Sequence, residues 1–321
     1  MNDEGMLPSP RPPFNRLFAR VGGRRGRALG RPGGGRAGPV IGMRWGAGGW
    51  HAGAVLTTDE VESFVADGFV AIREAVPGDV IAACQQVIWA ELAKQGVTED
   101  PASWTEPVVR ISCPEGGPFV AAGTQPVVWE ACDQLIGPPD RWWRRPGVGG
   151  SLAVRFPSER DPGDAGWHIE SSYAEDGNPW VNYRSRSRGL LALYLLTDVD
   201  EASAPTRLRP GSHLDAAGVL APAGDAGMPW LEAAQAAAAV TEHLPTVLAT
   251  GRAGDVFLCH PFLVHAASWP HRGTRPRVIA QPGVALHDQF PLTAPVSPVE
   301  QAILAASQSQ TAAGPYEKQG R

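Results

Sequence analysis

The stretch Gly189-Leu-Leu-Ala-Leu-Tyr-Leu-Leu-Thr-Asp-Val199 is an apolar run bounded by turn residues. A run of this length with such flanks is typical of a strand buried in a β core. Further strand candidates lie on both sides of it, with Pro and Gly punctuating the intervals: Ser151–Phe156, Asp255–Cys259, Phe262–Ala266 and Arg277–Val284. These short strands, without regular strand–helix alternation, favour a β-sandwich or barrel core.

Helical periodicity is strongest before these strands. A helix start is predicted at Thr57–Asp59, and apolar residues recur at helical spacing over Pro77–Lys94. Another helix is expected over Pro126–Ile136, and an Ala-rich one over Leu231–His243. Tyr173–Arg188 is predicted to be a long polar loop beside the site, with arginines at 184, 186 and 188 able to receive an anionic substrate. The fold class is therefore α+β with a mainly β core flanked by helices.

Charge and composition divide the chain into three parts. Residues 1–55 carry nine Arg and two acidic residues, or +7, so the remainder carries −12 of the total −5. We predict a disordered Gly/Arg/Pro-rich tail over 1–55 and a folded domain over 56–290 with a helical insertion near 214–245. A partly helical extension is expected over 291–321. The acidic body argues against nucleic-acid binding by the folded domain.

Several protein classes are disfavoured by composition. Hydrophobic residues make up 43% of the 321, enough for a sizeable core. No run approaches the ~18 apolar residues of a membrane helix, and the first residues lack the apolar segment of a secretory signal. The four cysteines form no C-x-x-C pair, which suits a reducing compartment. We therefore expect a cytoplasmic protein without a membrane partner.

Two histidine-bearing segments carry the candidate chemistry. In Trp167-His168-Ile169-Glu170, residues two apart share a face of an extended chain, so His168 and Glu170 can offer donors to one point. The second segment, His260-Pro-Phe-Leu-Val-His265, lies far enough downstream to return across a sandwich. Two histidines and one carboxylate form the facial triad of non-haem Fe(II) oxygenases. Spacing alone leaves open whether His260 or His265 completes it.

Arginines supply the second part of the candidate site. Arg275-Pro-Arg277 begins the strand candidate after the distal histidine, where a guanidinium can clamp a carboxylate through two hydrogen bonds. Arg155 precedes the first motif and is a further candidate to reach the site. Arg207 and Arg209 are expected on one face, meeting either a ligand or an interior salt bridge. We also expect a turn or outer-shell role for His213, a structural role for His260, a solvated His271, and Trp167 as a pocket wall.

These motifs resemble the phytanoyl-CoA dioxygenase family of Fe(II)- and 2-oxoglutarate-dependent enzymes. The resemblance covers roughly Leu56 to Leu286. The segments that carry it are Phe64-Val-Ala-Asp-Gly-Phe-Val-Ala-Ile-Arg-Glu-Ala-Val-Pro77, His168-Ile-Glu170, Ala204-Pro-Thr-Arg-Leu-Arg-Pro-Gly-Ser-His213 and His260-Pro-Phe-Leu-Val-His265. The resemblance implies a double-stranded β-helix, that is, a cupin-like jelly roll. It also implies Fe(II) on His168, Glu170 and His265, and Arg277 bound to the distal carboxylate of 2-oxoglutarate.

The chain departs from the family pattern at three places. Glu170 stands where the family has Asp, which moves the carboxylate by ~1.5 Å, about one bond length. Arg277 lies twelve residues after His265, one more than is typical, so Arg275 is the alternative clamp. Ala267 replaces a hydroxyl that helps to hold 2-oxoglutarate in some members. Halogenating relatives have a small residue instead of the carboxylate, so Glu170 favours hydroxylation or desaturation.

The resemblance predicts a dioxygenase that uses dioxygen to hydroxylate an unactivated C–H bond of a small molecule. One alternative is a cupin-like zinc or manganese hydrolase or isomerase with the same three ligands. The other is a metal-binding module without oxygenase activity. The sequence leaves the substrate and the oligomeric state open.

Overall fold

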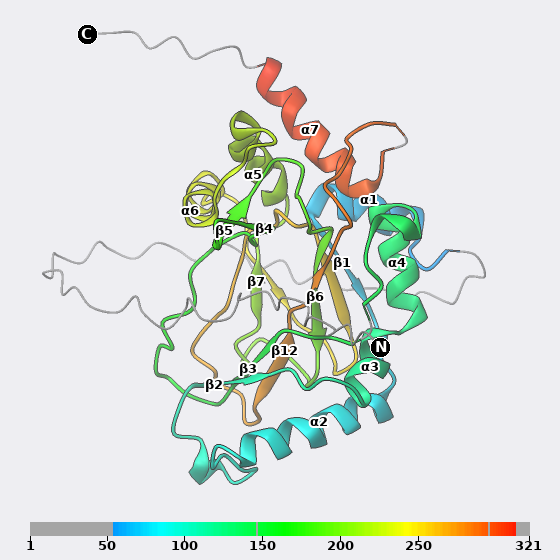
Figure 1. Ribbon diagram of the computed structural model, residues 1–321. Coiled ribbons are helices and arrows are strands. Elements are labelled where there is room, and N and C mark those ends of the chain that lie inside the picture. The colour runs from blue at the N-terminus through cyan, green and yellow to red at the C-terminus, as the bar shows by residue number, and fades with distance from the viewer. Residues whose placement is uncertain (1–53, 146, 295, 313–321) are drawn as a thin grey trace, which may run out of the picture.

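The computed structural model describes residues 54–145, 147–294 and 296–312, so the predicted tail 1–55 lies outside it apart from residues 54 and 55. Its centre is a large antiparallel sheet (Figure 1). The strands of this main sheet, in spatial order, are β1 (Phe69–Ile72), β10 (Val256–Cys259), β6 (Leu190–Leu195), β12 (Arg277–Ala280), β3 (Ser151–Arg155) and β2 (Val108–Ser112), with β13 (Gly283–Val284) also paired to β6.

Two smaller antiparallel sheets complete the β structure. The second sheet has the order β11 (His265–Ala266), β7 (Thr206–Leu208), β9 (Val247–Ala249). The third has the order β4 (Tyr173–Glu175), β5 (Asn178–Val181), β8 (Met228–Pro229). One apolar cluster contains Leu193 of the main sheet together with Leu208 and Ala249 of the second sheet, so these two sheets pack face to face.

Strand β6 is buried along its whole length, which explains its unbroken apolar sequence. Its odd-numbered residues, such as Leu191 and Leu193, face the second sheet. Its even-numbered residues, such as Leu190 and Tyr194, belong to the larger cluster that the helices share. Because alternate residues of a strand point to opposite faces, both faces must be apolar. The two facing sheets with helices outside confirm the predicted α+β jelly roll.

The helices pack around the outside of the sheets (Figure 1). They are α1 (Thr58–Asp67), α2 (Gly78–Ala93), α3 (Pro118–Gly123), α4 (Pro126–Ile136), α5 (Ser212–Leu220), α6 (Trp230–Val240) and α7 (Pro298–Ala312), with short 3-10 turns η2 (Pro101–Ser103), η3 (Pro139–Arg141) and η4 (Ala221–Ala223). Helix α1 starts at a capping box in which Thr57 and Glu60 satisfy each other's backbone N–H groups. Every helix in the described ranges falls short of the length and apolar character that crossing a bilayer requires.

Helix α7 is anchored by a buried acid. Glu300 has no exposed surface, and its carboxylate accepts hydrogen bonds from Arg141 Nη1 (2.5 Å), Leu292 N (2.9 Å) and Ser297 N (3.0 Å). A buried charge is tolerated only when it is paired and hydrogen-bonded in this way. The helix thereby covers the core beside α1 and α5.

Local structure differs from the sequence-based expectation in three regions. Of the strand predicted over Phe262–Ala266, only His265–Ala266 is a strand, β11. The strand predicted over Arg277–Val284 is broken into β12 and β13 because Pro282, between them, has no N–H to donate. The segment predicted as a polar loop contains the hairpin β4–β5. Asp176 and Gly177 form its turn with positive φ of 49° and 78°, the backbone geometry of a type I′ turn, for which Asp-Gly is a preferred pair.

Two histidines outside the metal motif are buried side by side. His213 and His260 have ring centroids 4.8 Å apart and at most 1% exposure. His213 Nε2 donates to Val65 O at 3.0 Å, and His260 Nδ1 accepts from Phe262 N at 3.1 Å. Burial lowers the pKa of His213 to about 4, and burial followed by the neighbouring His213 lowers the pKa of His260. Both rings are thus neutral parts of the core, not ligands.

This pair predicts that the protein loses stability in mild acid. The unfolded chain protonates these histidines near pH 6.5, whereas folded His213 resists protonation until about pH 4. As pH falls from 6.5 towards 4, each such histidine lowers the free energy of unfolding by up to about 1.4 kcal/mol per pH unit. Urea unfolding at pH 7.5 and 5.0 measures the slope. His213→Gln should flatten it, and an unchanged slope in this variant would contradict the assignment.

Candidate metal centre

The backbones of His168 and His265 are joined directly. His168 N donates to His265 O at 3.0 Å, and His265 N donates to His168 O at 2.9 Å, forming an isolated antiparallel bridge. His265 begins β11, so the bridge ties the segment after β3 to the second sheet. Residues opposite one another in an antiparallel pair point to the same side. The two imidazole rings consequently lie with centroids 4.4 Å apart.

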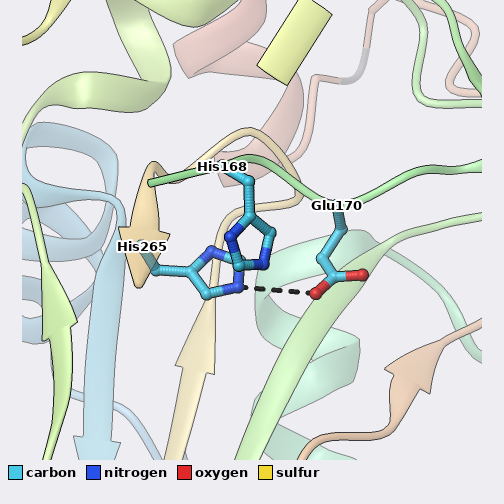
Figure 2. Close-up of side chains that lie close together, drawn as sticks. All are labelled: His168, Glu170 and His265. Atoms are coloured by element: carbon cyan, nitrogen blue, oxygen red, sulfur yellow. Dashed lines mark ion pairs between the residues drawn. The ribbon is translucent and has the colours of Figure 1, made fainter. Parts of the chain in front are cut away.

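Glu170 lies on the same side of the chain as the two rings, because it is two residues after His168 in an extended segment. Ile169, between them, is fully buried on the other side. One donor atom from each of His168, Glu170 and His265 lies within 4.8 Å of the other two (Figure 2). Glu170 Oε1 is 3.4 Å from His265 Nε2. Within the described residues, this is the one such cluster of His, Cys, Asp or Glu side chains.

Backbone carbonyls fix the orientation of both rings. His168 Nδ1 lies 2.8 Å from Gly166 O, and His265 Nδ1 lies 3.0 Å from Leu263 O. A carbonyl only accepts, so each Nδ1 carries a proton, and in the neutral ring Nε2 holds a lone pair. Burial and the neighbouring His265 lower the pKa of His168 to about 4, which keeps this ring neutral. Lone pairs and a carboxylate that converge on one point fit a divalent cation.

The Glu170 carboxylate has a second partner. Its Oε2 lies 3.6 Å from Arg188 Nη2. Burial alone raises the pKa of Glu170, but that pKa is held below its usual range, and the Arg188 guanidinium is the largest cause of the lowering. Glu170 is thus an anion at neutral pH.

Arg277 faces the space between the two sheets. On β12 it lies two residues before Ile279 and therefore on the same face of the strand, and Ile279 belongs to the cluster between the sheets. In the register of the sheet, Arg277 lies opposite Arg155 of β3. Arg277 is 3% exposed, and its Nε and Nη2 donate to Ala204 O at 3.1 and 2.7 Å. Burial and then Arg155 lower the pKa of Arg277 to about 9, so it stays protonated at neutral pH. Arg275, by contrast, is exposed.

Arg155 and Arg277, both buried, differ in their partners. Arg155 Nη2 binds both oxygens of Asp164 at 2.7 Å, and Asp164 also pairs with Arg110. No described carboxylate lies within ion-pair distance of Arg277. A buried guanidinium without a counter-ion is costly, so Arg277 has an unmet capacity to bind an anion.

Arg207, Arg209 and Trp167 form a separate cluster on the outer side of the second sheet. Their neighbour Leu208 packs between the sheets, so Arg207 and Arg209 point the other way. Both guanidinium groups lie over the Trp167 ring, at 4.6 and 4.2 Å from its centroid. They bind backbone carbonyls, Ala267 O and Ala238 O respectively, and form no ion pair among the described residues. The prediction of an interior salt bridge for these arginines was therefore wrong, whereas a ligand contact and a pocket-wall role for Trp167 stay predictions.

Other sequence-based expectations also change. His271, predicted to be solvated, is 5% exposed because its backbone pairs with Ser158. Arg184 binds Phe290 O and Arg186 lies over the Tyr173 ring, and their expected role in receiving an anionic substrate stays a prediction. The contact between Arg188 and Glu170 was not predicted, and sequence pattern carries no signal for it.

A jelly roll that brings two histidines and one carboxylate within reach of one point has the donor set of a two-histidine, one-carboxylate metal site. The sequence profile of the phytanoyl-CoA dioxygenase (PhyH) family matches residues 64–279, about two thirds of the chain. The chain belongs to this family. A search of the curated proteins finds no significant match.

Solved structures with a similar chain path include three enzymes from other sources. The 2-oxoglutarate-dependent carbocyclase SnoK from nogalamycin biosynthesis is 19% identical, with 74% of this chain and 87% of that chain covered and a TM-score of 0.49. EctD from S. alaskensis, with 2-oxoglutarate and 5-hydroxyectoine, is 18% identical (74% and 78% covered; TM-score 0.47). HygX from Streptomyces hygroscopicus, with nickel, 2-oxoglutarate and hygromycin B, is 16% identical (72% and 87% covered; TM-score 0.47).

The geometry predicts that His265→Ala abolishes tight binding of a divalent metal. Loss of a direct ligand should cost more than the ~10- to 100-fold that loss of an outer-shell partner costs. Isothermal titration with Ni(II) measures this affinity, and circular dichroism checks the fold. His243, which is exposed on the surface, provides the matched control His243→Ala. Equal affinity in the two variants would exclude His265 as a ligand.

Proposed function

We propose that this protein is an Fe(II)- and 2-oxoglutarate-dependent dioxygenase that hydroxylates a C–H bond of a small molecule. The observation that carries this proposal is the convergence of His168 Nε2, Glu170 Oε1 and His265 Nε2 within one metal-sized space. Family membership supports the same reading.

His168, Glu170 and His265 would hold Fe(II) on one face, leaving the opposite face for co-substrate and dioxygen. Bound iron with 2-oxoglutarate supplies the oxidising power for C–H chemistry, which no side chain can provide. The residues of this chain bind and orient. The carbonyls of Gly166 and Leu263 set the two rings, and burial keeps His168 deprotonated at Nε2.

Arg277 would bind the distal carboxylate of 2-oxoglutarate. Its guanidinium is buried, protonated and without a carboxylate partner among the described residues, and it faces the interior that the metal ligands also face. Arg155 adds positive charge opposite it, although Asp164 already pairs with Arg155. A carboxylate from the co-substrate would supply the counter-ion that Arg277 lacks.

Glu170 favours hydroxylation over halogenation. Its carboxylate fills the ligand position that a halide would need, and the Arg188 guanidinium favours its ionised form. The other two readings, a zinc or manganese hydrolase and a metal-binding module without oxygenase activity, use the same ligands but have no need of 2-oxoglutarate. Either alternative would be favoured if the protein neither bound 2-oxoglutarate nor formed succinate.

The direct test is succinate formation. Protein loaded anaerobically with Fe(II) and 2-oxoglutarate should form succinate when oxygen is admitted, and a chelator should abolish it. Slow turnover without the organic substrate suffices for detection. Failure to bind 2-oxoglutarate together with no succinate would overturn the proposal. A screen of small molecules for product then follows.

Arg277→Gln should weaken 2-oxoglutarate binding selectively. Loss of a charge-assisted pair costs about 1.5–3 kcal/mol, which is a ~10- to 100-fold increase in Kd, while Ni(II) affinity stays within a few-fold of wild type. Titration of 2-oxoglutarate into the metal-loaded protein measures the change. Arg275→Gln is the matched control, because Arg275 is exposed two residues away. A larger effect in Arg275→Gln would make that residue the clamp instead.

A further inference from the structure

The two oxygens of Glu170 face different partners. Oε1 lies 3.4 Å from His265 Nε2, on the side of the metal donors, whereas Oε2 lies 3.6 Å from Arg188 Nη2. Glu has one more rotatable bond than the Asp typical of the family, so its carboxylate reaches further and is freer to turn. Something must hold the longer side chain in one orientation if it is to act as a well-defined ligand.

Two further hydrogen bonds restrain Arg188, one through its side chain and one through its backbone. Its Nε donates to Ser171 O at 2.7 Å, so the guanidinium spans Glu170 and the next residue in the chain. Its own carbonyl accepts from Ser185 Oγ at 2.7 Å, which fixes the backbone just before β6. The Arg188 side chain is only 19% exposed. A restrained guanidinium of this kind can orient a carboxylate, not merely screen its charge.

The Arg188 guanidinium occupies space that is free because Gly283 on β13 has no side chain. A Cβ added at Gly283 would overlap Arg188 Nη1 and crowd Cζ. Gly283 lies opposite Leu191 in the main sheet, and its φ is not positive, so Ala suits its backbone. The absence of a side chain at this position therefore serves the placement of Arg188, not a backbone turn.

We propose that Arg188 is a positioning residue that holds Oε2 of Glu170 away from the metal, so that Glu170 binds through Oε1 alone. This inference rests on the metal role proposed above for Glu170. Binding through one oxygen preserves the open face that a chelating co-substrate needs. Without Arg188 the carboxylate would be free to turn and offer both oxygens, and ligand geometry would change even though all three ligands remain.

The test compares four single variants by two readouts. Ni(II) affinity is measured by isothermal titration, and the visible absorption of bound Co(II) reports coordination number. Arg188→Gln should weaken Ni(II) binding ~10- to 100-fold and change the Co(II) spectrum, while Arg188→Lys should restore part of both. Gly283→Ala, which leaves Arg188 in the sequence but fills its space, should shift both readouts in the same direction as Arg188→Gln. Arg186→Gln is the matched control, because Arg186 contacts Tyr173 in the same segment.

A double-mutant cycle with Glu170→Asp separates positioning from general destabilisation. The shorter Asp withdraws the carboxylate from Arg188 by ~1.5 Å, so Arg188→Gln should have little further effect on Ni(II) affinity in that background. An equal loss in both backgrounds would overturn the inference, as would wild-type affinity and spectrum in Arg188→Gln. If wild-type protein itself bound no divalent metal, both this inference and the proposed function would fail. Metal binding that is normal in wild type and in Arg188→Gln would refute the inference alone.

Discussion

The site depends on two backbone hydrogen bonds between His168 and His265. The segment that carries His168 follows a Pro- and Gly-rich stretch, 157–166, and has no place in either facing sheet. The bridge positions this segment, because it fixes the register and the direction of the chain relative to β11. Strand alternation then sends Ile169 into the core and brings Glu170 back beside the rings. One local pairing event thus positions all three donors.

Electrostatics inside the jelly roll favours anions. Arg155, Arg277 and Arg188 contribute three buried or nearly buried positive charges, whereas Asp164 and Glu170 contribute two negative ones. A metal ion would add to the positive side. Such an excess in a low-dielectric interior is costly unless a ligand brings compensating negative charge. The interior is therefore suited to a small dicarboxylate, which would neutralise both the metal and Arg277.

Much of this organisation could be predicted from sequence. The apolar run at β6 required a strand buried on both faces, and the His168 and His265 motifs, read with the family resemblance, predicted the donors that the structure brings together. What could not be predicted depends on long-range register. Arg207 and Arg209 share a face by alternation, but only their pairing with β11 shows that this face points outward. His271 has polar neighbours in sequence yet is buried by pairing with Ser158.

The Arg188–Glu170 contact illustrates a different limit. It depends on a space left by Gly283, nearly a hundred residues further along the chain, and on a side-chain torsion that no spacing rule describes. The hairpin turn at Asp176-Gly177, by contrast, carries a local signal. The polar residues around this pair nevertheless favour a loop when the sequence alone is considered.

The anchoring of α7 has a consequence for how the protein is made. Val299 and Ile303 belong to the same core cluster as Phe64 of α1, and Glu300 supplies the carboxylate that Arg141 and two backbone N–H groups require. A nascent chain still lacking these residues would expose the first helix and leave Arg141 without its buried partner. The packing around α1 and Arg141 is therefore complete only once the chain has been made through α7.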